Sequence, residues 1–252
     1  SRGRAQVTVV NGSDQFVERI RLHQHAAGEV LPVRSIDKFL RPTGAAFHKG
    51  FVRAIHAQQK SVEVDGTLLR YDQLIIALGS HTDRSRVPGA AAHTFTMDAD
   101  SAERLRARLP ALASAGAHLA ICGGGLTAIE IASELAERFP TLKVSLYTSG
   151  QVGDFLSERG RAHPQQALTT LGVTVVEHTP VHEVRATELV TAAGTVPIAA
   201  CVWATGFRAS PLIAAAGLAH NEAGQARVDA ALRSLSHPDS IHVIGDAASP
   251  IG

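Results

Sequence analysis

Two segments within the first 80 residues show the period-two and continuous apolar patterns that are typical of strands. The run "AQVTVVN" (residues 5–11), closed by the turn-forming "NGSD", predicts a short buried strand. Residues 60–80, "KSVEVDGTLLRYDQLIIALGS", alternate on both sides of Asp65–Gly66, a pair typical of hairpin turns. They then continue into an all-apolar strand that stops at Gly79. These two segments are therefore predicted to be β-structure.

The period changes to that of a helix in the middle of the chain. Residues 98–116, "DADSAERLRARLPALASAG", predict an exposed connecting helix with Ser101 as its N-cap. The strand-like "AHLAIC" follows. Beyond a glycine run, apolar residues recur at three- and four-residue steps, which predicts a helix with one buried face. These residues are Leu126, Ile129, Ala132, Leu135 and Phe139.

A second strand, "LKVSLYT", completes a strand–turn–helix–strand unit of about 30 residues. A helical stretch at residues 161–171 and the strand "GVTVVEH" extend it, so residues 117–178 predict half of a Rossmann domain. Residues 180–204 contain the short segments "HEVRAT", "ELVTAA" and "TVPIAACVWA", which favour an antiparallel meander. The last predicted strand is "SIHVIGDAASPIG". The fold class is therefore α/β, with a parallel sheet and an added meander.

Composition and charge exclude several classes of protein. With 252 residues and 45% apolar residues, the chain can bury a core and form one or two domains. Lys and Arg number 24 against 23 Asp and Glu, and the basic residues are scattered, so no nucleic-acid-binding surface is indicated. No apolar run reaches the ~18 residues of a membrane span and no signal peptide is evident, so we expect a cytoplasmic protein.

The two cysteines, Cys122 and Cys201, are 79 positions apart and form no CxxC pair. Neither a disulfide framework nor a zinc site is indicated. Both lie on apolar segments, and we interpret them as small core residues in a reducing compartment.

The glycine run "ICGGGLTAIE" has the chemistry of a dinucleotide-binding turn. Gly123 and Gly125 allow a sharp turn and a close approach to a pyrophosphate, and the small Ala128 lets the helix pack on the strand. The pyrophosphate is then expected at the helix N-terminus, where free N–H groups favour negative charge. A glycine-rich structural turn is the alternative.

Coenzyme preference is expected to depend on the end of the second strand, where an acid favours NAD and an arginine favours NADP. Here the strand ends in Tyr147, Thr148 and Ser149. This neutral end removes repulsion of a 2′-phosphate without supplying a cation, and we expect NADPH to be tolerated beside NADH.

Five segments, in order, carry a resemblance to a known family. They are "VTVVNGSDQFVERIRLHQHAAG", "YDQLIIALGS", "ICGGGLTAIEIASEL", "WATGF" and "IHVIGDAA". The chain resembles flavin-dependent NAD(P)H dehydrogenases of the pyridine nucleotide-disulfide oxidoreductase family, in particular type II NADH dehydrogenases. The resemblance implies a partial FAD-binding domain, residues 1–112 and 205–252, with an NAD(P)H-binding domain, residues 113–204, inserted into it.

The resemblance also implies which residues bind the two cofactors. NAD(P)H is expected at Gly123, Gly124, Gly125, Leu126, Thr127, Ala128, Tyr147 and Thr148. FAD is expected at Asn11 (adenosine ribose), Ala77 and Gly79 of "ALGS", Thr205 and Gly206 of "ATGF", and Gly245 and Asp246 (ribityl chain). Glu130 matches the helix acid that lies near nicotinamide and flavin, and we assign it as the catalytic residue. Turn capping by Asn11 and Asp246, and a solvated helix position for Glu130, are the alternatives.

By the same resemblance, a hydride passes from NAD(P)H to flavin N5, and electrons continue to a quinone or another small acceptor. The absence of CxxC argues against a redox-disulfide route. The family's FAD-pyrophosphate glycine motif is missing, because only residues 1–5 precede "VTVV", and the C-terminal quinone-pocket portion is missing too. We therefore interpret the chain as an inactive fragment of a protein that is peripheral to the inner membrane face. Whether that protein forms a homodimer is left open. A degenerate homologue is the alternative to a fragment, and a flavin-free NAD(P)-binding sensor or interaction module is the alternative function.

Two further features have weaker interpretations. His23 and His25 share one face if "RLHQH" is extended and would then suit a metal, but no third ligand is apparent, so we favour a loop or packing role. Phe207 and Arg208 follow the second crossing segment, where we expect a structural role at a domain border.

Overall fold

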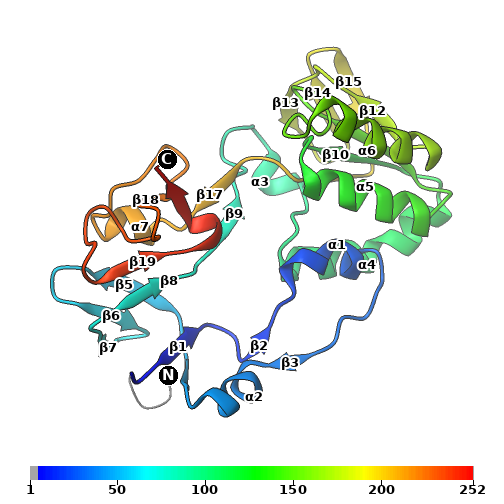
Figure 1. Ribbon diagram of the computed structural model, residues 1–252. Helices are drawn as coiled ribbons and strands as arrows, with labels where there is room; N and C mark the ends of the chain where they lie inside the picture. The colour runs from blue at the N-terminus through cyan, green and yellow to red at the C-terminus, as the bar shows by residue number, and fades with distance from the viewer. Residues whose placement is uncertain (1–4, 252) are drawn as a thin grey trace. The chain divides into compact units, whose positions relative to one another are not determined.

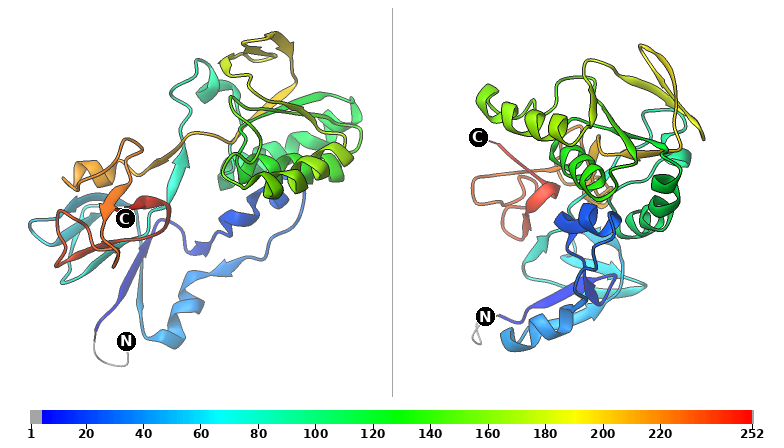
Figure 2. Two further views of the ribbon diagram at one scale, coloured as in Figure 1. Left: turned by 45° about the horizontal axis from the view of Figure 1, so that its top comes forward. Right: turned by 90° about the vertical axis from the view of Figure 1, so that its right-hand side faces the viewer.

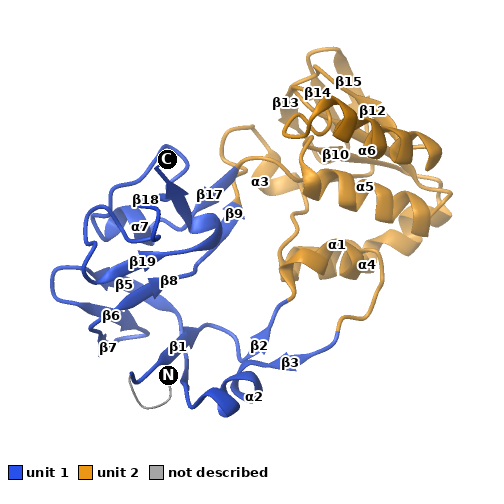
Figure 3. Cartoon of the chain, in the orientation of Figure 1, with its two compact units in different colours: residues 1–17, 32–81, 207–252 blue, residues 18–31, 82–206 orange. Residues whose placement is uncertain are grey.

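The computed structural model describes residues 5–251, which form two compact units (Figure 3). Unit 1 contains residues 1–17, 32–81 and 207–252, and unit 2 contains residues 18–31 and 82–206. Unit 2 is thus larger than the inserted domain expected from the sequence, because it also includes residues 18–31, 82–112 and 205–206. The assignment of one cofactor to each unit remains a proposal.

Unit 2 is built on a four-stranded parallel sheet in the order β12-β11-β10-β16. The strands are β10 (His118–Cys122), β11 (Lys143–Tyr147), β12 (Thr174–Val176) and β16 (Ala200–Trp203). Helix α5 (Leu126–Arg138) connects β10 to β11, and α6 (Glu158–Thr170) connects β11 to β12. Figures 1 and 2 show α5 and α6 side by side. The predicted strand–turn–helix–strand unit and the Rossmann-like α/β fold are confirmed.

Successive residues of the central strand β10 face two different hydrophobic cores. Leu119 and Ile121 point into a core shared with the helices, whereas Ala120 and Cys122 point into a core on the opposite face of the sheet. Because both faces are covered, residues 119–122 of the strand are all apolar, as is typical of parallel sheets, and only His118 at its start is polar.

Helix α4 (Ala99–Ser114) packs into the helix-side core of unit 2 through Leu105 and Leu109, which are fully buried. Its N-cap is Asp98, whose carboxylate accepts a 2.9 Å hydrogen bond from the N–H of Ser101. The prediction of Ser101 as N-cap is therefore wrong. Its hydroxyl instead accepts a bond from the N–H of Thr96, which ties down the chain before the helix.

The antiparallel meander predicted for residues 180–204 is shorter than expected. Its strands are β13 (Val181–Val184), β14 (Glu188–Thr191) and β15 (Gly194–Pro197). The fourth segment, β16, pairs in parallel with β10 instead. All four of its residues are buried, so it is apolar on both faces, which suits the parallel sheet and not an edge of the meander.

Unit 1 combines parallel strand pairs with a three-stranded antiparallel sheet and a short antiparallel pair, β2 (Gln15–Phe16) with β3 (Arg34–Ser35). The parallel pairs are β1 (Thr8–Asn11) with β4 (Ala46–Lys49), β8 (Leu74–Ile76) with β19 (Ile241–Val243), and β18 (Ala226–Val228) with β20 (Ala248–Pro250). The antiparallel sheet contains β5 (Val52–His56), β6 (Ser61–Val64) and β7 (Thr67–Arg70). The hairpin at Asp65–Gly66 is confirmed, since both residues have positive φ between β6 and β7. Strand β1 is half-buried or exposed, not buried as predicted, because it pairs only with β4 in the described residues.

The remaining elements are short. They are α1 (Leu22–Ala26), α2 (Ile36–Leu40), α3 (Ala90–His93), α7 (Leu212–Ala215), β2 (Gln15–Phe16), β3 (Arg34–Ser35), β9 (Ser80–Thr82), β17 (Phe207–Ala209) and the 3-10 turns η1 (Arg19–Arg21), η2 (Arg41–Thr43) and η3 (Gly245–Ala247). No helix among the described residues combines the length and apolar character needed to cross a membrane.

Candidate functional site

The turn between β10 and α5 requires glycine at its first position. Gly123 has a φ of +143°, and a Cβ there would lie 2.6 Å from the carbonyl oxygen of Ala204. Its N–H donates to the carbonyl of Tyr147 at 2.8 Å, which fixes the turn on the neighbouring strand. The nearest side chain is that of Ala128, fully buried at the start of α5, so helix and strand approach as the motif predicts.

The next two glycines differ from each other in their surroundings. A Cβ at Gly124 would lie 2.7 Å from Thr148 Oγ1 and 3.0 Å from the carbonyl oxygen of Gln151. Gly125 is the N-cap of α5, with extended backbone and no side-chain capping bond, and a Cβ there would meet no atom within 4 Å. Of the next two residues, Leu126 is exposed and Thr127 is half-buried. The N-terminus of α5 is therefore open to an anion.

A pocket of about 210 Å³ adjoins this turn. It lies across the carboxyl ends of three neighbouring parallel strands, the position where open α/β sheets bind ligands. Its lining includes Cys122, Gly123, Tyr147, Thr148, Trp203 and Thr205. The structure thus brings together the glycine turn, the end of β11 and the end of β16. The first two were expected together at the NAD(P)H site, whereas Thr205 at the end of β16 was assigned to FAD.

The pocket's aromatic and thiol groups are uncharged. Burial raises the pKa of the Tyr147 phenol above its ordinary value. A hydrogen bond between Cys122 and Cys201, whose Sγ atoms are 3.6 Å apart, and burial raise the pKa of the Cys122 thiol well above its ordinary value. Both cysteines are free and buried, so their interpretation as core residues is confirmed. Trp203 is fixed by a 3.2 Å hydrogen bond from its indole nitrogen to the carbonyl of Asp83.

Glu130 lies on α5 with its side chain about half exposed (47%). Its Oε2 is 3.8 Å from Nδ1 of His23 on α1. His25 contacts a different acid, Glu103, at 2.8 Å. The segment "RLHQH" is helical and not extended, so the premise for a shared metal-binding face is wrong. No group of three or more potential metal ligands occurs in residues 5–251.

In unit 1 the structure joins two motifs that are far apart in the sequence. The hydroxyl of Ser80 donates a 2.9 Å hydrogen bond to Oδ2 of Asp246, 166 positions away. Ala77 and Gly79 precede Ser80 after β8, and Gly245 precedes Asp246 after β19, so the parallel pairing of these strands explains the contact. Both glycines have positive φ, +64° and +65°.

Two residues of this cluster were missed in the sequence analysis. Ser80 stands in the quoted "ALGS", but only its motif neighbours were chosen. Gln225 donates from Nε2 to the carbonyl oxygens of Asp246 and Ala248, at 2.9 and 3.3 Å. No motif marks Gln225, and only the pairing of β18 with β20 brings it there.

The remaining predicted positions have mainly structural contacts. The side-chain nitrogen of Asn11 donates to the carbonyl of Ser13 at 2.7 Å, which is the turn-capping alternative. Gly206 has a φ of +74°, and its carbonyl accepts a hydrogen bond from the N–H of Asp83. Thr205 is exposed beside it. A role of these three residues in binding FAD stays a prediction.

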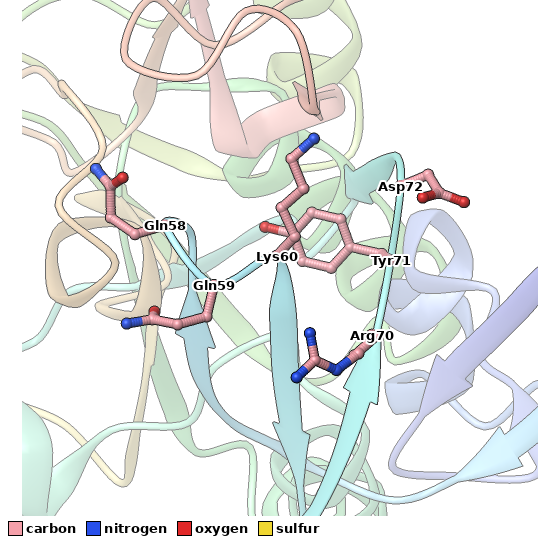
Figure 4. A pocket seen from close by; sticks show the side chains of 6 residues that line it. All are labelled: Gln58, Gln59, Lys60, Arg70, Tyr71 and Asp72. Carbon is pink, nitrogen blue, oxygen red and sulfur yellow. The ribbon is translucent and has the colours of Figure 1, made fainter.

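A second hollow, of about 390 Å³, lies in unit 1 at one end of the antiparallel sheet (Figure 4). Figure 4 shows the Lys60 amine and the Arg70 guanidinium extending in opposite directions on either side of the Tyr71 ring. The Tyr71 hydroxyl is buried without a hydrogen-bond partner, and burial raises its pKa. Because the two cations do not converge, this hollow is not organised around a single anionic ligand.

Comparison with known proteins agrees with these features. Among curated proteins, the chain is 27% identical over 261 residues to demethylphylloquinone reductase from Synechocystis sp., covering 96% of this chain and 64% of that protein. It is 32% identical over 228 residues to an NADH dehydrogenase-like protein from Mycobacterium tuberculosis, covering 83% and 57%. The chain thus spans about three-fifths of the length of these relatives.

Solved structures share the fold at lower identity. NDH2 from Plasmodium falciparum, solved in complex with NADH, has a TM-score of 0.84 at 19% identity. The match covers 98% of this chain and 60% of the NDH2 chain. A sulfide:quinone oxidoreductase from Aquifex aeolicus has a TM-score of 0.86 at 15% identity, with coverages of 97% and 63%. The family model for pyridine nucleotide-disulphide oxidoreductases matches residues 3–251. With this match over nearly its whole length, the chain belongs to the pyridine nucleotide-disulphide oxidoreductase family.

Proposed function

We propose that unit 2 binds NAD(P)H and that the whole protein is a flavin-dependent NAD(P)H dehydrogenase with a quinone or another small acceptor. The observation that carries the proposal is the turn at residues 123–125, which presents an open helix N-terminus beside a pocket at the ends of three parallel strands. Dinucleotide-binding Rossmann domains use this arrangement for the pyrophosphate.

The residues of unit 2 fit a bound NAD(P)H. The open space at Gly125 leaves room for a phosphate next to the first N–H groups of α5. Trp203 and Tyr147 supply flat apolar surface in the neutral pocket. Thr148 and Thr205 supply hydroxyl groups at its two flanking strand ends. Such a mixture of apolar walls and few polar groups is typical of cofactor sites.

The residues of unit 1 fit part of an FAD molecule. Ser80 holds the Asp246 carboxylate by one oxygen, which orients the other to accept a hydrogen bond from a hydroxyl. Asp246 itself is exposed at the end of β19. A strand–glycine turn–helix motif for the FAD pyrophosphate does not occur among the described residues of unit 1. We therefore assign Asp246 the ribityl chain and assign no residue here to the flavin pyrophosphate.

A flavin, when bound, accepts the hydride of NAD(P)H, while the protein supplies position and electrostatics. The turn at Gly123 and the N-terminus of α5 hold the coenzyme's phosphates. Glu130, one turn into α5 and half exposed, supplies a carboxylate at the nicotinamide end of the site. His23 Nδ1 lies 3.8 Å from this carboxylate.

The names of the relatives favour a quinone as acceptor. One is a demethylphylloquinone reductase, and a protein 28% identical over 56% of this chain is a type II NADH:quinone oxidoreductase from Staphylococcus saprophyticus. Cys122 and Cys201 are both buried, and the pKa of the Cys122 thiol is raised, which makes them poor thiol nucleophiles. A small-molecule acceptor is therefore favoured over a route through these thiols.

The test is to purify the full-length protein, measure its flavin absorbance, and add NADH or NADPH anaerobically before offering a water-soluble quinone. We expect bleaching of the flavin band by the coenzyme and its return with the quinone. Asp246→Asn is expected to lower flavin content, whereas Asp239→Asn, another exposed carboxylate of unit 1, is expected to leave it unchanged. A flavin-containing protein that oxidises neither coenzyme with any quinone contradicts the proposal, and a colourless protein that binds NADPH supports the flavin-free module instead.

A further inference from the structure

The segment that follows β11 lies directly on the glycine turn. The N–H of Gly153 donates to the carbonyl of Gly124 at 2.8 Å, and Thr148 and Gln151 provide the atoms nearest to a Cβ at Gly124. In a coenzyme whose pyrophosphate rests on this turn, the adenosine ribose comes next along the molecule. Residues 148–153 are therefore the part of the protein that meets the ribose 2′ position, an inference that rests on the proposed function.

No carboxylate is available at this position to select a 2′-hydroxyl. The strand ends in the neutral Thr148 and Ser149. The two acids of the surrounding loops are engaged in holding the segment itself. Glu177 Oε1 accepts the N–H of Val152 at 2.8 Å, and Asp154 Oδ2 accepts the N–H of Gln151 at 2.9 Å. The usual device for preferring NADH is thus absent from the described residues here.

A cation is present instead, supplied by the first turn of α6. Arg161 Nη1 donates to the side-chain oxygen of Gln151 and lies 3.5 Å from Asp154 Oδ1. The stem of Arg161 packs on the same loop, since a Cβ at Gly153 would lie 3.3 Å from its Cγ. The side chain is only 24% exposed, so its guanidinium is held at the segment instead of extending into water.

Arg161 was not recognised from the sequence because it follows the strand end by about a dozen residues. A guanidinium has five N–H donors, and the contacts of Arg161 with Gln151 and Asp154 both involve Nη1. Donors remain for the oxygens of a phosphate, which arginine binds in a bidentate manner. The partial pairing with Asp154, at 3.5 Å, is loose enough for a phosphate dianion to compete with it.

We propose that this site accepts the 2′-phosphate of NADPH, with Arg161 and Ser149 as the residues that determine coenzyme specificity. Arg161 supplies charge and N–H donors, and the exposed Ser149 supplies a hydroxyl at the strand end. NADPH then binds at least as tightly as NADH, and its affinity falls more steeply with salt because it adds an ion pair.

The test is calorimetric titration of the full-length protein with NADH, NADPH, ADP and 2′,5′-ADP, the last two isolating the adenosine half of the site. Arg161→Gln is expected to lower the affinity for NADPH and 2′,5′-ADP by about 10- to 100-fold, because hydrogen bonds to a charged group are lost. Its affinity for NADH is expected to fall by less than about 2-fold. Arg159→Gln, an exposed arginine on the same helix, is the matched control and is expected to change neither. Ser149→Asp is expected to reverse the preference in favour of NADH.

The outcomes separate the two proposals. Binding of NADH and ADP with much weaker binding of NADPH and 2′,5′-ADP overturns this inference alone. Equal losses for NADH and NADPH in Arg161→Gln also overturn it, because they show that the arginine merely supports the loop. Failure of all four compounds to bind overturns the proposed coenzyme site, and this inference with it.

Discussion

Replacing Gly123 with alanine tests the turn on which the site is built. The residue has a φ of +143°, which alanine adopts only with strain of about 1–3 kcal/mol. The new Cβ would also lie 2.6 Å from the carbonyl oxygen and 3.0 Å from the carbonyl carbon of Ala204. Those atoms are backbone, and the N–H of Ala204 is bonded to the carbonyl of Cys122 at 2.8 Å, so the neighbour cannot move aside freely.

Overpacking of this kind costs about 1–3 kcal/mol, so the total loss is about 2–6 kcal/mol. This is a large part of the about 5–15 kcal/mol that holds a typical protein folded. Urea unfolding, followed by the emission of Trp203, measures the loss within unit 2, since the chain contains a single tryptophan and it immediately precedes Ala204. We expect Gly123→Ala to lower the urea midpoint strongly.

Gly125→Ala is the matched control, because a Cβ there meets no atom within 4 Å and φ is −84°. Alanine lowers the entropy of the unfolded chain, which stabilises the folded variant by about 0.4–1 kcal/mol. Alanine is also a poorer N-cap than glycine, which destabilises the folded variant by a similar amount. Its stability should change by less than about 1 kcal/mol, while its methyl group hinders phosphate approach and weakens coenzyme binding about 10- to 100-fold. A destabilised Gly125→Ala together with an unaffected Gly123→Ala would refute this reading of the turn.

Three further predictions concern other parts of the fold. Asp98→Ala removes the N-cap of α4 and should lower the free energy of unfolding by about 0.5–2 kcal/mol in urea titrations, whereas Asp98→Asn should retain most of it. The Cys122 thiol, buried and with a raised pKa, should resist a thiol-labelling reagent in the native protein even at mildly alkaline pH and react fully in denaturant; rapid native labelling would show that the core is open. Ser80→Ala frees the Asp246 carboxylate and should accelerate flavin loss on dialysis, with unchanged flavin retention arguing against the ribityl assignment.

Local patterns account for much of unit 2. The glycine turn, the apolar strands on either side and the helix period at residues 126–139 each depend on neighbours in the sequence, and all three are found. The buried run Ala200–Trp203 was assigned to the wrong sheet, although its lack of polar positions is itself typical of a strand covered on both faces. The alternation of the preceding segments concealed this difference.

Contacts between distant segments were not predictable in the same way. Ser80 reaches Asp246 only because β8 and β19 pair in parallel, and no spacing rule connects positions 166 apart. Arg161 similarly meets the end of β11 through the return of α6 over the loop, so a search for a cation immediately after the strand misses it. The N-cap of α4 was predicted at Ser101 but is Asp98, three residues earlier, and only backbone geometry distinguishes these two polar residues.

Fluorescence of Trp203 tests the coenzyme site most directly, because this sole tryptophan lines the pocket beside the glycine turn. Reduced nicotinamide absorbs where tryptophan emits, so a coenzyme bound there must quench the indole. We predict saturable quenching of Trp203 by NADH and NADPH, with sensitised nicotinamide emission and a midpoint shifted about 10- to 100-fold in Gly125→Ala. Quenching that does not saturate, or that is identical in the variant, would contradict coenzyme binding at this turn.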